Sequence, residues 1–297
     1  MKTRLIAMAA LGLCVLTTPT SSSAQTPWQQ AVASNLGKTG TEMPGGVYRV
    51  GLPRTDLKVT LDGVPLKAGF ALGSWVAFMP HGAGQAMVMG DLVLTDAEVN
   101  PVMKRLLDGG FEITALHNHL LTAAPQTMYM HVGATGDPAK LATTLHEALA
   151  LSGTPFTAPA AASPPPALDL DTAAIDQALG HKGKNNGGVY QFGIARATTP
   201  HGGGMALPDA MGSAIAINFQ PTGGGKAAIT GDFVLTANEV QPVLKALRAN
   251  GIDVTALHNH MLDDEPRLFF MHFWANDDAR KLASGLAQAL SHVKTAR

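Results

Sequence analysis

The sequence predicts an α+β protein made of two tandem homologous repeats, each a mainly antiparallel sheet with helices packed on it. The first observation is a long internal match between Gly90–Leu121 and Gly231–Leu262, in which 19 of 32 positions are identical at an offset of 141 residues. The second observation is that short strand-like segments alternate with helix-like segments inside each copy. Because similarity at a fixed spacing indicates a duplicated structural unit, we expect both copies to fold alike.

The match continues on both sides of this block and divides the chain. Upstream, "GGVYRVGLPR" (Gly45–Arg54) matches "GGVYQFGIAR" (Gly187–Arg196), and downstream "DPAKL" matches "DARKL". Between the copies, "TPFTAPAAASPPPA" has too many prolines for a helix or a central strand, so we expect a semi-extended linker. We therefore predict a signal peptide at residues 1–24, repeat 1 at 25–153, a Pro/Ala-rich linker at 154–168 and repeat 2 at 169–297.

The order of elements is predicted from the first repeat, and the second repeat should copy it. Asp137 suits the N-cap and Pro138 the first position of a helix, whereas Gly109 and Gly110 should stop the preceding one. The last part of each repeat then has the order β-α-β-β-α, which is ferredoxin-like. The expected strands are Val47–Leu52, Leu57–Leu61, Ser74–Met79, Ala86–Leu94, Glu112–Leu120 and Thr127–Val132, with helices within Thr95–Leu107 and from about Pro138 to Leu151.

The first residues predict export. Lys2 and Arg4 precede a short apolar run, and small residues before Gln25 offer a cleavage site, as is typical of a secretory signal peptide. Cleavage after Ala24 would remove the only cysteine and leave 19 basic against 22 acidic residues. No later apolar run is long enough to span a membrane, and no basic patch indicates nucleic acid. We expect a periplasmic or secreted protein whose partner is a small molecule or a component of the cell envelope.

Several motifs resemble those of a known family. "GDLVLTDAEVNPVM", "ALHNHLL", "MYMH" and "LDTAAIDQALGHKGKNNGGVYQFGIAR" are similar to the LppY/LpqO family of exported bacterial proteins, and the resemblance covers nearly all of the chain after the signal peptide. It implies export and the duplicated layout, and it implies no particular reaction or ligand. Some members resemble lipoproteins, but lipid attachment at Cys14 would need a small residue where this chain has Leu13.

Each repeat carries three histidines at the same spacing. Residues two apart on a strand share a face, and a hairpin around Pro125 would place His131 roughly opposite His119. Three imidazoles on one face match the ligand set of a catalytic zinc site that keeps an open fourth position. The candidate metal ligands are therefore His117, His119 and His131 in the first repeat, and His258, His260 and His272 in the second.

Two alternatives stay open for these histidines. They could be buried structural residues that a duplication copied, or they could be ligands of a metal. Imidazole suits zinc, copper, iron and nickel, and thioethers favour Cu(I). Because Met128, Met130 and Met271 alternate away from the histidine face, they are expected in the core. Zinc is therefore the first choice of metal and copper the second.

Acidic residues near the histidines have competing interpretations. Glu98 and Glu239 match the third position of a capping box, although a later helix start would release them for other work. Asp91 and Asp232 follow glycines inside apolar strands. Either residue could accept a hydrogen bond from an imidazole, and a bond to a turn is the preferred interpretation. The acidic loop 263–265 occurs only in the second repeat and is expected to be solvated.

Three functions remain as hypotheses. The first is an exported protein that binds a transition metal through duplicated three-histidine sites and acts as a metal-dependent hydrolase. The second is a non-enzymatic envelope module that binds a saccharide, peptide or protein, with structural histidines. The third is metal storage or delivery. The sequence identifies no catalytic residue and no organic cofactor, because it contains no G-x-S-x-G, H-E-x-x-H or phosphate-binding motif.

Overall fold

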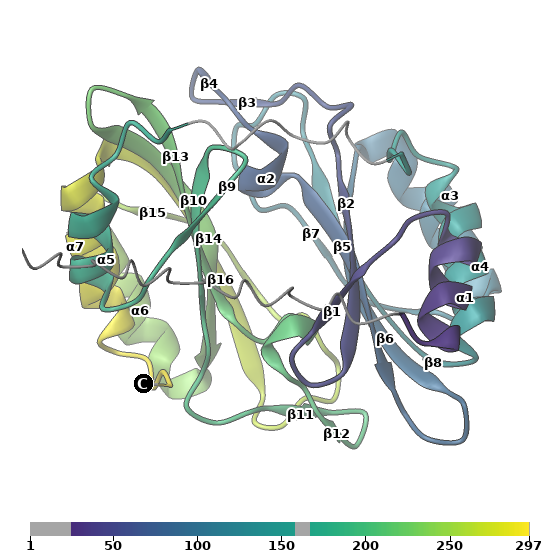
Figure 1. The fold of residues 1–297 in the computed structure, drawn as a ribbon. Coiled ribbons are helices and arrows are strands. Elements are labelled where there is room, and N and C mark those ends of the chain that lie inside the picture. The colour runs from purple at the N-terminus through teal and green to yellow at the C-terminus, as the bar shows by residue number, and fades with distance from the viewer. Residues whose placement is uncertain (1–24, 158–166, 297) are drawn as a thin grey trace, which may run out of the picture.

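Two six-stranded antiparallel sheets face one another in the computed structural model, which describes residues 25–157 and 167–296. Figure 1 shows helices on the outer side of each sheet, so the layers run helix, sheet, sheet, helix. The predicted α+β class with two tandem repeats is confirmed. The predicted signal peptide and the middle of the predicted linker lie outside the described residues. Within those residues, no helix combines the length and the apolar character needed to cross a membrane.

The first repeat forms a sheet with the strand order β1-β2-β5-β6-β8-β7, in which all neighbours are antiparallel. Its elements are α1 (Pro27–Leu36), β1 (Thr41–Met43), β2 (Val47–Pro53), β3 (Thr60–Leu61), β4 (Val64–Pro65), α2 (Ala68–Ala71), β5 (Gly73–Pro80), β6 (Ala86–Leu94), α3 (Asp96–Asp108), β7 (Glu112–His117), β8 (Met128–Gly136) and α4 (Pro138–Leu149).

The second repeat has the same arrangement, with the strand order β9-β10-β13-β14-β16-β15. Its elements are α5 (Thr172–Leu179), β9 (Lys184–Asn186), β10 (Val189–Ile194), β11 (His201–Gly202), β12 (Met205–Ala206), the short 3-10 helix η1 (Asp209–Met211), β13 (Ile215–Gly223), β14 (Lys226–Thr236), α6 (Ala237–Ala249), β15 (Asp253–His258), β16 (Leu268–Asp278) and α7 (Ala279–Leu290).

The ferredoxin-like element is confirmed in both copies. In the first, β8 lies between β6 and β7, and α3 and α4 follow β6 and β8 along the chain. Thr95 and Glu98 form the predicted capping box at the start of α3, and the Asp137 carboxylate accepts hydrogen bonds from two backbone amides at the start of α4. Helix α3 begins at Asp96 and includes Pro101, so the alternative of a later helix start is wrong.

Two strand predictions were too long, and several short elements were not predicted. The predicted strand Leu57–Leu61 is reduced to the two residues of β3, and the predicted strand Glu112–Leu120 ends at His117. The last residue pair between β7 and β8 is His117 with Tyr129, and beyond His117 the chain leaves β8. The N-terminal helices and edge strands of each repeat (α1, β1, α5 and β9) were missed, although Thr26 and Pro27 give α1 a capping box and a proline start.

Each repeat also reaches across to the other. The loop that carries β3, β4 and α2 contacts the second sheet, where Trp274 Nε1 donates to Asp62 Oδ2 at 2.8 Å and Lys67 Nζ donates to the Gly188 carbonyl at 2.8 Å. Apolar clusters span the same interface, and one of them joins Phe70, Leu120 and Tyr129 to Val189 and Trp274. These contacts hold the inner faces of the two sheets against one another.

Candidate metal centre

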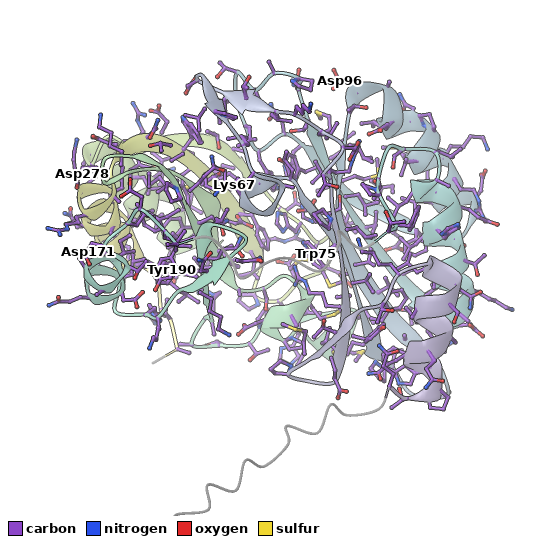
Figure 2. The ribbon with its side chains drawn as sticks, turned by 45° about the horizontal axis from the view of Figure 1, so that its top comes forward. Lys67, Trp75, Asp96, Asp171, Tyr190 and Asp278 are labelled. Atoms are coloured by element: carbon purple, nitrogen blue, oxygen red, sulfur yellow. The ribbon has the colours of Figure 1, made fainter. Side chains whose placement is uncertain are left out.

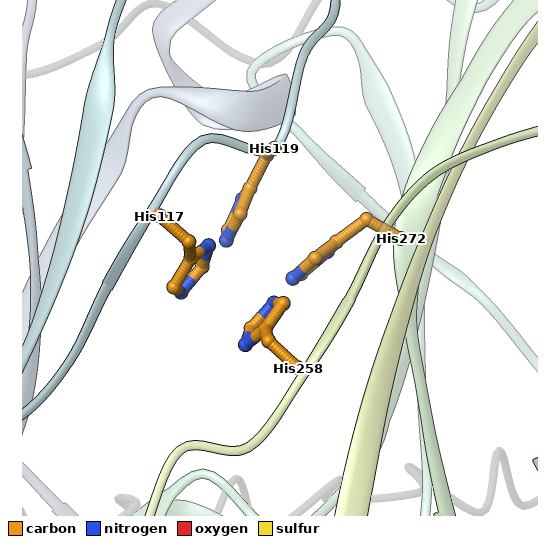
Figure 3. A group of neighbouring side chains, drawn as sticks. All are labelled: His117, His119, His258 and His272. Atoms are coloured by element: carbon orange, nitrogen blue, oxygen red, sulfur yellow. The ribbon is translucent and has the colours of Figure 1, made fainter.

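The six candidate histidines of the two repeats gather in one place between the sheets. His117 and His258 are the last residues of β7 and β15, while His119 and His260 lie two residues beyond those strands. His131 and His272 lie within β8 and β16. Figure 3 shows His117 and His119 from the first repeat pointing toward His258 and His272 from the second.

The hairpin register differs from the predicted one. A bulge between Ile113 and Ala115 sets the pairing of β7 with β8, so that His131 lies opposite Ala115. The expectation that His131 lies opposite His119 is therefore wrong, because β7 has ended before His119. His119 lies in the loop after β7, so the direction of its side chain does not follow the alternation of the two strand faces.

The imidazole rings pair across the repeats. The ring centroids of His119 and His272 are 3.6 Å apart, and those of His131 and His260 are also 3.6 Å apart. His117 and His258 stack on one another at 3.5 Å and are equivalent residues of the two copies. The histidines therefore form one centre with approximate two-fold symmetry, in place of two separate triads.

An aromatic ring closes each of the two outer stacks. Tyr129 lies 3.5 Å from His119, and its equivalent Phe270 lies 3.4 Å from His260, measured between ring centroids. Both aromatic residues are fully buried, and the Tyr129 hydroxyl donates to the Ala71 carbonyl at 2.8 Å. These rings restrict the orientation of the imidazoles, so the centre is held in place before any ligand binds.

The Nε2 atoms of all six histidines are buried and have no hydrogen-bond partner among the described residues. Three of the rings show which tautomer they adopt. Nδ1 contacts the backbone oxygen of Gly231 at 2.9 Å in His272, of Asn259 at 3.2 Å in His258 and of Asn118 at 3.4 Å in His117. Because a carbonyl oxygen only accepts, Nδ1 carries the proton and Nε2 keeps a lone pair for a ligand.

Burial keeps these imidazoles neutral. It lowers the pKa of His117 to about 3 and that of His258 to about 4, and in His117 the neighbouring His258 adds to the effect. The pKa values of the other four histidines also lie well below the ordinary value, again mainly because of burial. Since only neutral imidazole binds a metal, the centre is in its ligand form at neutral pH.

Two aspartates lie at the edge of the histidine centre. Asp91 Oδ1 is 3.8 Å from His131 Nε2, and Asp232 lies 3.9 Å from His260 Nε2 and 3.8 Å from His272 Nδ1. Burial raises the pKa of Asp91 to about 7 and that of Asp232 well above its ordinary range. In both residues Oδ1 is buried without a hydrogen-bond partner, so the preferred interpretation of a bond to a turn is wrong.

Glycines before these aspartates allow the strands to approach closely. A Cβ at Gly231 would lie 2.0 Å from the Ala216 carbonyl oxygen, and one at Gly90 would lie 2.9 Å from the Trp75 carbonyl oxygen. A side chain at either position would push the neighbouring strand away. The Gly-Asp pairs of the sequence therefore place a carboxylate beside the histidines.

The centre offers four overlapping sets of metal ligands, each with its ligand atoms within 4.8 Å of one another. Two sets combine the repeats and consist only of histidines, and two lie inside one repeat and include an aspartate. The sets are His117, His119, His258 and His272; His117, His131 and His260; Asp91, His119 and His131; and Asp232, His260 and His272. These side chains could hold a metal ion, as the sequence predicted.

A cavity of about 730 Å³ between the inner faces of the sheets gives access to the centre. Four of the histidines and both aspartates line it, together with Arg49 and Trp75 of the first repeat. This volume lies within the range of small-molecule sites in proteins. Arg49 could not be identified from the sequence, because the Tyr-Arg pair of one copy aligns with Tyr-Gln in the other and neither belongs to a recognisable motif.

Other candidate residues have structural roles. Met130 and Met271 are fully buried in the cores, as expected. Glu98 binds Arg54, and Glu239 binds Arg196 in the equivalent place, so both carboxylates are used outside the centre. In the acidic loop, Asp264 accepts from the Leu268 amide and is buried, so the expectation of a fully solvated loop is wrong for this residue.

A family model described as "Domain of Unknown Function (DUF1259)" matches the chain twice, at residues 30–151 and 173–292. No curated protein matches the chain. Among solved structures, the chain is similar to the trimeric bacterial microcompartment shell protein PduB, with 13% identity, 82% of this chain and 86% of that chain covered, and a TM-score of 0.18. The chain is also similar to EtuB from Clostridium kluyveri, with 12% identity, 86% of this chain and 91% of that chain covered, and a TM-score of 0.21.

Proposed function

Because the chain belongs to the DUF1259 family, whose description assigns no activity, we propose a function from the histidine centre itself: the protein binds a transition metal between its two repeats. The observation that carries this proposal is the set of six buried Nε2 atoms without hydrogen-bond partners. Structural histidines would be expected to use both ring nitrogens, because a buried polar atom without a partner is costly.

The metal positions that we propose are shared between the repeats. One uses His119 and His272, the other uses His131 and His260, and His117 and His258 lie between them. Two groups of histidines support this assignment, because each brings ligand atoms from both repeats within 4.8 Å of one another: His117, His119, His258 and His272, and His117, His131 and His260. Asp91 and Asp232 are placed to orient the imidazoles or to complete the coordination.

Zinc is the metal that the ligands fit best, with copper second. Imidazole and carboxylate are both common zinc ligands. A thioether ligand would have favoured copper, but Met130 and Met271 are fully buried in the cores. Met261 is also buried against the core of the second repeat.

Hydrolysis is the activity that we propose for the loaded protein. A bound zinc ion supplies a water molecule of lowered pKa and a Lewis acid. The cavity beside the centre lets a small molecule reach it, and the carboxyl group of Asp91, which lines the same cavity, would accept or release a proton there. A protein that only stores metal has no need for a cavity of this size.

Export is part of the same proposal. The charged and apolar residues before Gln25 and the resemblance to the LppY/LpqO family support a periplasmic or secreted protein. In such a compartment, the substrate would be a small molecule or a fragment of the cell envelope.

Metal loading tests the proposal directly. The full chain is stripped with a chelator, dialysed against zinc or copper, and its metal content is measured by mass spectrometry. We expect stoichiometric zinc in the wild type, loss of zinc in the double variant His117→Gln with His258→Gln, and no change in the control His292→Gln, whose side chain is exposed. Trace metal in the wild type would contradict the proposal and favour a binding module with structural histidines.

A further inference from the structure

The cavity beside the histidine centre contains a guanidinium group that the metal proposal does not use. Arg49 lies on β2, with its guanidinium carbon 3.8 Å from the ring centroid of Trp75. One of its nitrogens, Nη1, donates to the Ala210 carbonyl at 2.7 Å. Trp75 lies between the two sheets (Figure 2), and both side chains line the same cavity as the histidines.

The equivalent position of the second repeat is occupied by a neutral side chain. Gln191 aligns with Arg49, and it makes the corresponding bond across the interface, from Nε2 to the Gly69 carbonyl at 2.7 Å. Gln191 Nε2 also donates to Asn218 at 3.0 Å, and its Oε1 accepts from Asn186 at 2.8 Å. The polar groups of Gln191 are therefore all engaged, which indicates a structural role.

Arg49 keeps donors that Gln191 does not have. A guanidinium has five N–H groups, and the side chain of Arg49 makes a single hydrogen bond and no ion pair within the described part of the chain. The residue on which Arg49 stacks has also diverged between the repeats. Trp75 pairs with Asp91 on the neighbouring strand, whereas the residue that pairs with the equivalent Asp232 is Ala216. The two copies thus share the contact between the repeats, and only the first adds a stacked cation to the cavity.

We propose that Arg49 binds the oxyanion group, a carboxylate or a phosphate, of a small organic molecule in this cavity. The inference rests on the proposed function, since it describes the molecule on which the metal centre acts. A planar guanidinium binds such a group through two parallel hydrogen bonds, and stacking on Trp75 fixes its plane in advance. The anion would be held at Arg49, in the same cavity that four of the histidines line.

Part of the cavity wall is aromatic and suits an apolar group, and polar side chains such as Lys184 and Asn218 lie beside it. Phe70, Trp75, Tyr129 and Phe192 line the cavity, and its volume of about 730 Å³ is that of a site for a small molecule. Burial lowers the pKa of Arg49 to about 10, while the charge of Asp91 opposes this shift. The guanidinium stays protonated at neutral pH, and an anionic ligand would replace part of the hydration that burial removes.

Binding of simple anions tests this inference. Benzoate, phenyl phosphate and the neutral control benzyl alcohol are titrated calorimetrically into zinc-free and zinc-loaded full-length protein. The variant Arg49→Gln installs the side chain that the second repeat already tolerates, and Arg280→Gln is a matched control in an exposed ion pair. We expect an anion to bind the wild type, about 10- to 100-fold weaker binding to Arg49→Gln, and no change in Arg280→Gln.

The outcomes separate this inference from the metal proposal. Preference for benzoate over phenyl phosphate, or the reverse, identifies the oxyanion. Equal affinity of Arg49→Gln and wild type, or no advantage of either anion over benzyl alcohol, would overturn the role of Arg49 even if zinc binds stoichiometrically. Conversely, anion binding that depends on Arg49 in a protein without affinity for zinc would support this site and refute only the metal centre.

Discussion

Paired histidine substitutions can decide whether metals are shared between the repeats. In the shared arrangement, His119 and His272 serve one metal position, and His131 serves the other. The double variant His119→Gln with His272→Gln then removes one position, whereas His119→Gln with His131→Gln removes both. If each repeat held its own metal, the His119 and His272 double variant would lose both positions, and the His119 and His131 double variant would lose only the position in the first repeat.

The size of the effect follows from mass action. At a zinc concentration 100 times Kd, each independent position stabilises the fold by about 2.7 kcal/mol, so two positions contribute about 5.4 kcal/mol. Loss of an outer-shell partner already weakens metal binding about 10- to 100-fold, and loss of a ligand costs at least as much. A 100-fold weaker position stabilises by about 0.4 kcal/mol under the same conditions. The first double variant should therefore keep about half of the zinc-dependent stabilisation, and the second should keep almost none.

The assay combines metal content with thermal unfolding in the presence and absence of zinc. Zinc content per chain gives the number of positions, and the zinc-induced shift of the unfolding temperature gives their contribution to stability. His292→Gln again serves as the control, because His292 is exposed and lies outside the centre. Complete loss of zinc in the His119 and His272 double variant, together with retention of one zinc in the His119 and His131 double variant, would refute the shared arrangement.

Two further predictions concern stability. The metal-free protein should lose stability as the pH falls from about 6.5 toward 4, because burial lowers the pKa of the six histidines and the unfolded chain binds protons that the folded chain does not. The raised pKa values of Asp91 and Asp232 act in the opposite direction, but only two aspartates oppose six histidines. A free energy of unfolding that stays constant over this pH range in denaturant titrations would contradict the reasoning. Replacing Glu98 with alanine should cost about 1.5–3 kcal/mol in guanidinium unfolding, because the buried Arg54 loses a charged hydrogen-bond partner but keeps its ion pair with Asp56. Replacing Glu147, the exposed partner of Arg105, with alanine should lower the free energy of unfolding by less than about 1 kcal/mol. Equal losses in the Glu98 and Glu147 variants would show that burial of the ion pair does not determine its contribution.

The general fold could be predicted because several local signals agree. The duplicated block sets the number of repeats, and the capping box at Thr95 and the N-cap Asp137 give the starts of the two main helices of the first repeat. The end of β7 could not be predicted, because no glycine or proline marks it between His117 and Leu120, while β8 pairs with β7 only as far as His117. The bulge after Ile113, which sets the register, has no glycine or other mark in the sequence.

The residues of the candidate site could be predicted, but their partners could not. The spacing of His117, His119 and His131 indicates that imidazoles converge, and nothing in it says which repeat supplies the next ring. That choice depends on how the two sheets face one another, which is set by long-range contacts such as Trp274 with Asp62. Arg49 was missed for the same reason, since its importance depends on the cavity and on its divergence from Gln191.

The energetics argue against histidines that serve only to pack the interface. A buried polar atom without a partner is costly, and the Nε2 atoms of all six histidines share this condition among the described residues. Phenylalanine already stands at the place of Tyr129 in the second copy, so the chain can accept apolar rings next to these positions. The retention of imidazole at all six places, with every Nε2 buried and without a hydrogen-bond partner among the described residues, is therefore explained by a ligand that uses those lone pairs. A metal ion matches the number, neutrality and spacing of these imidazoles.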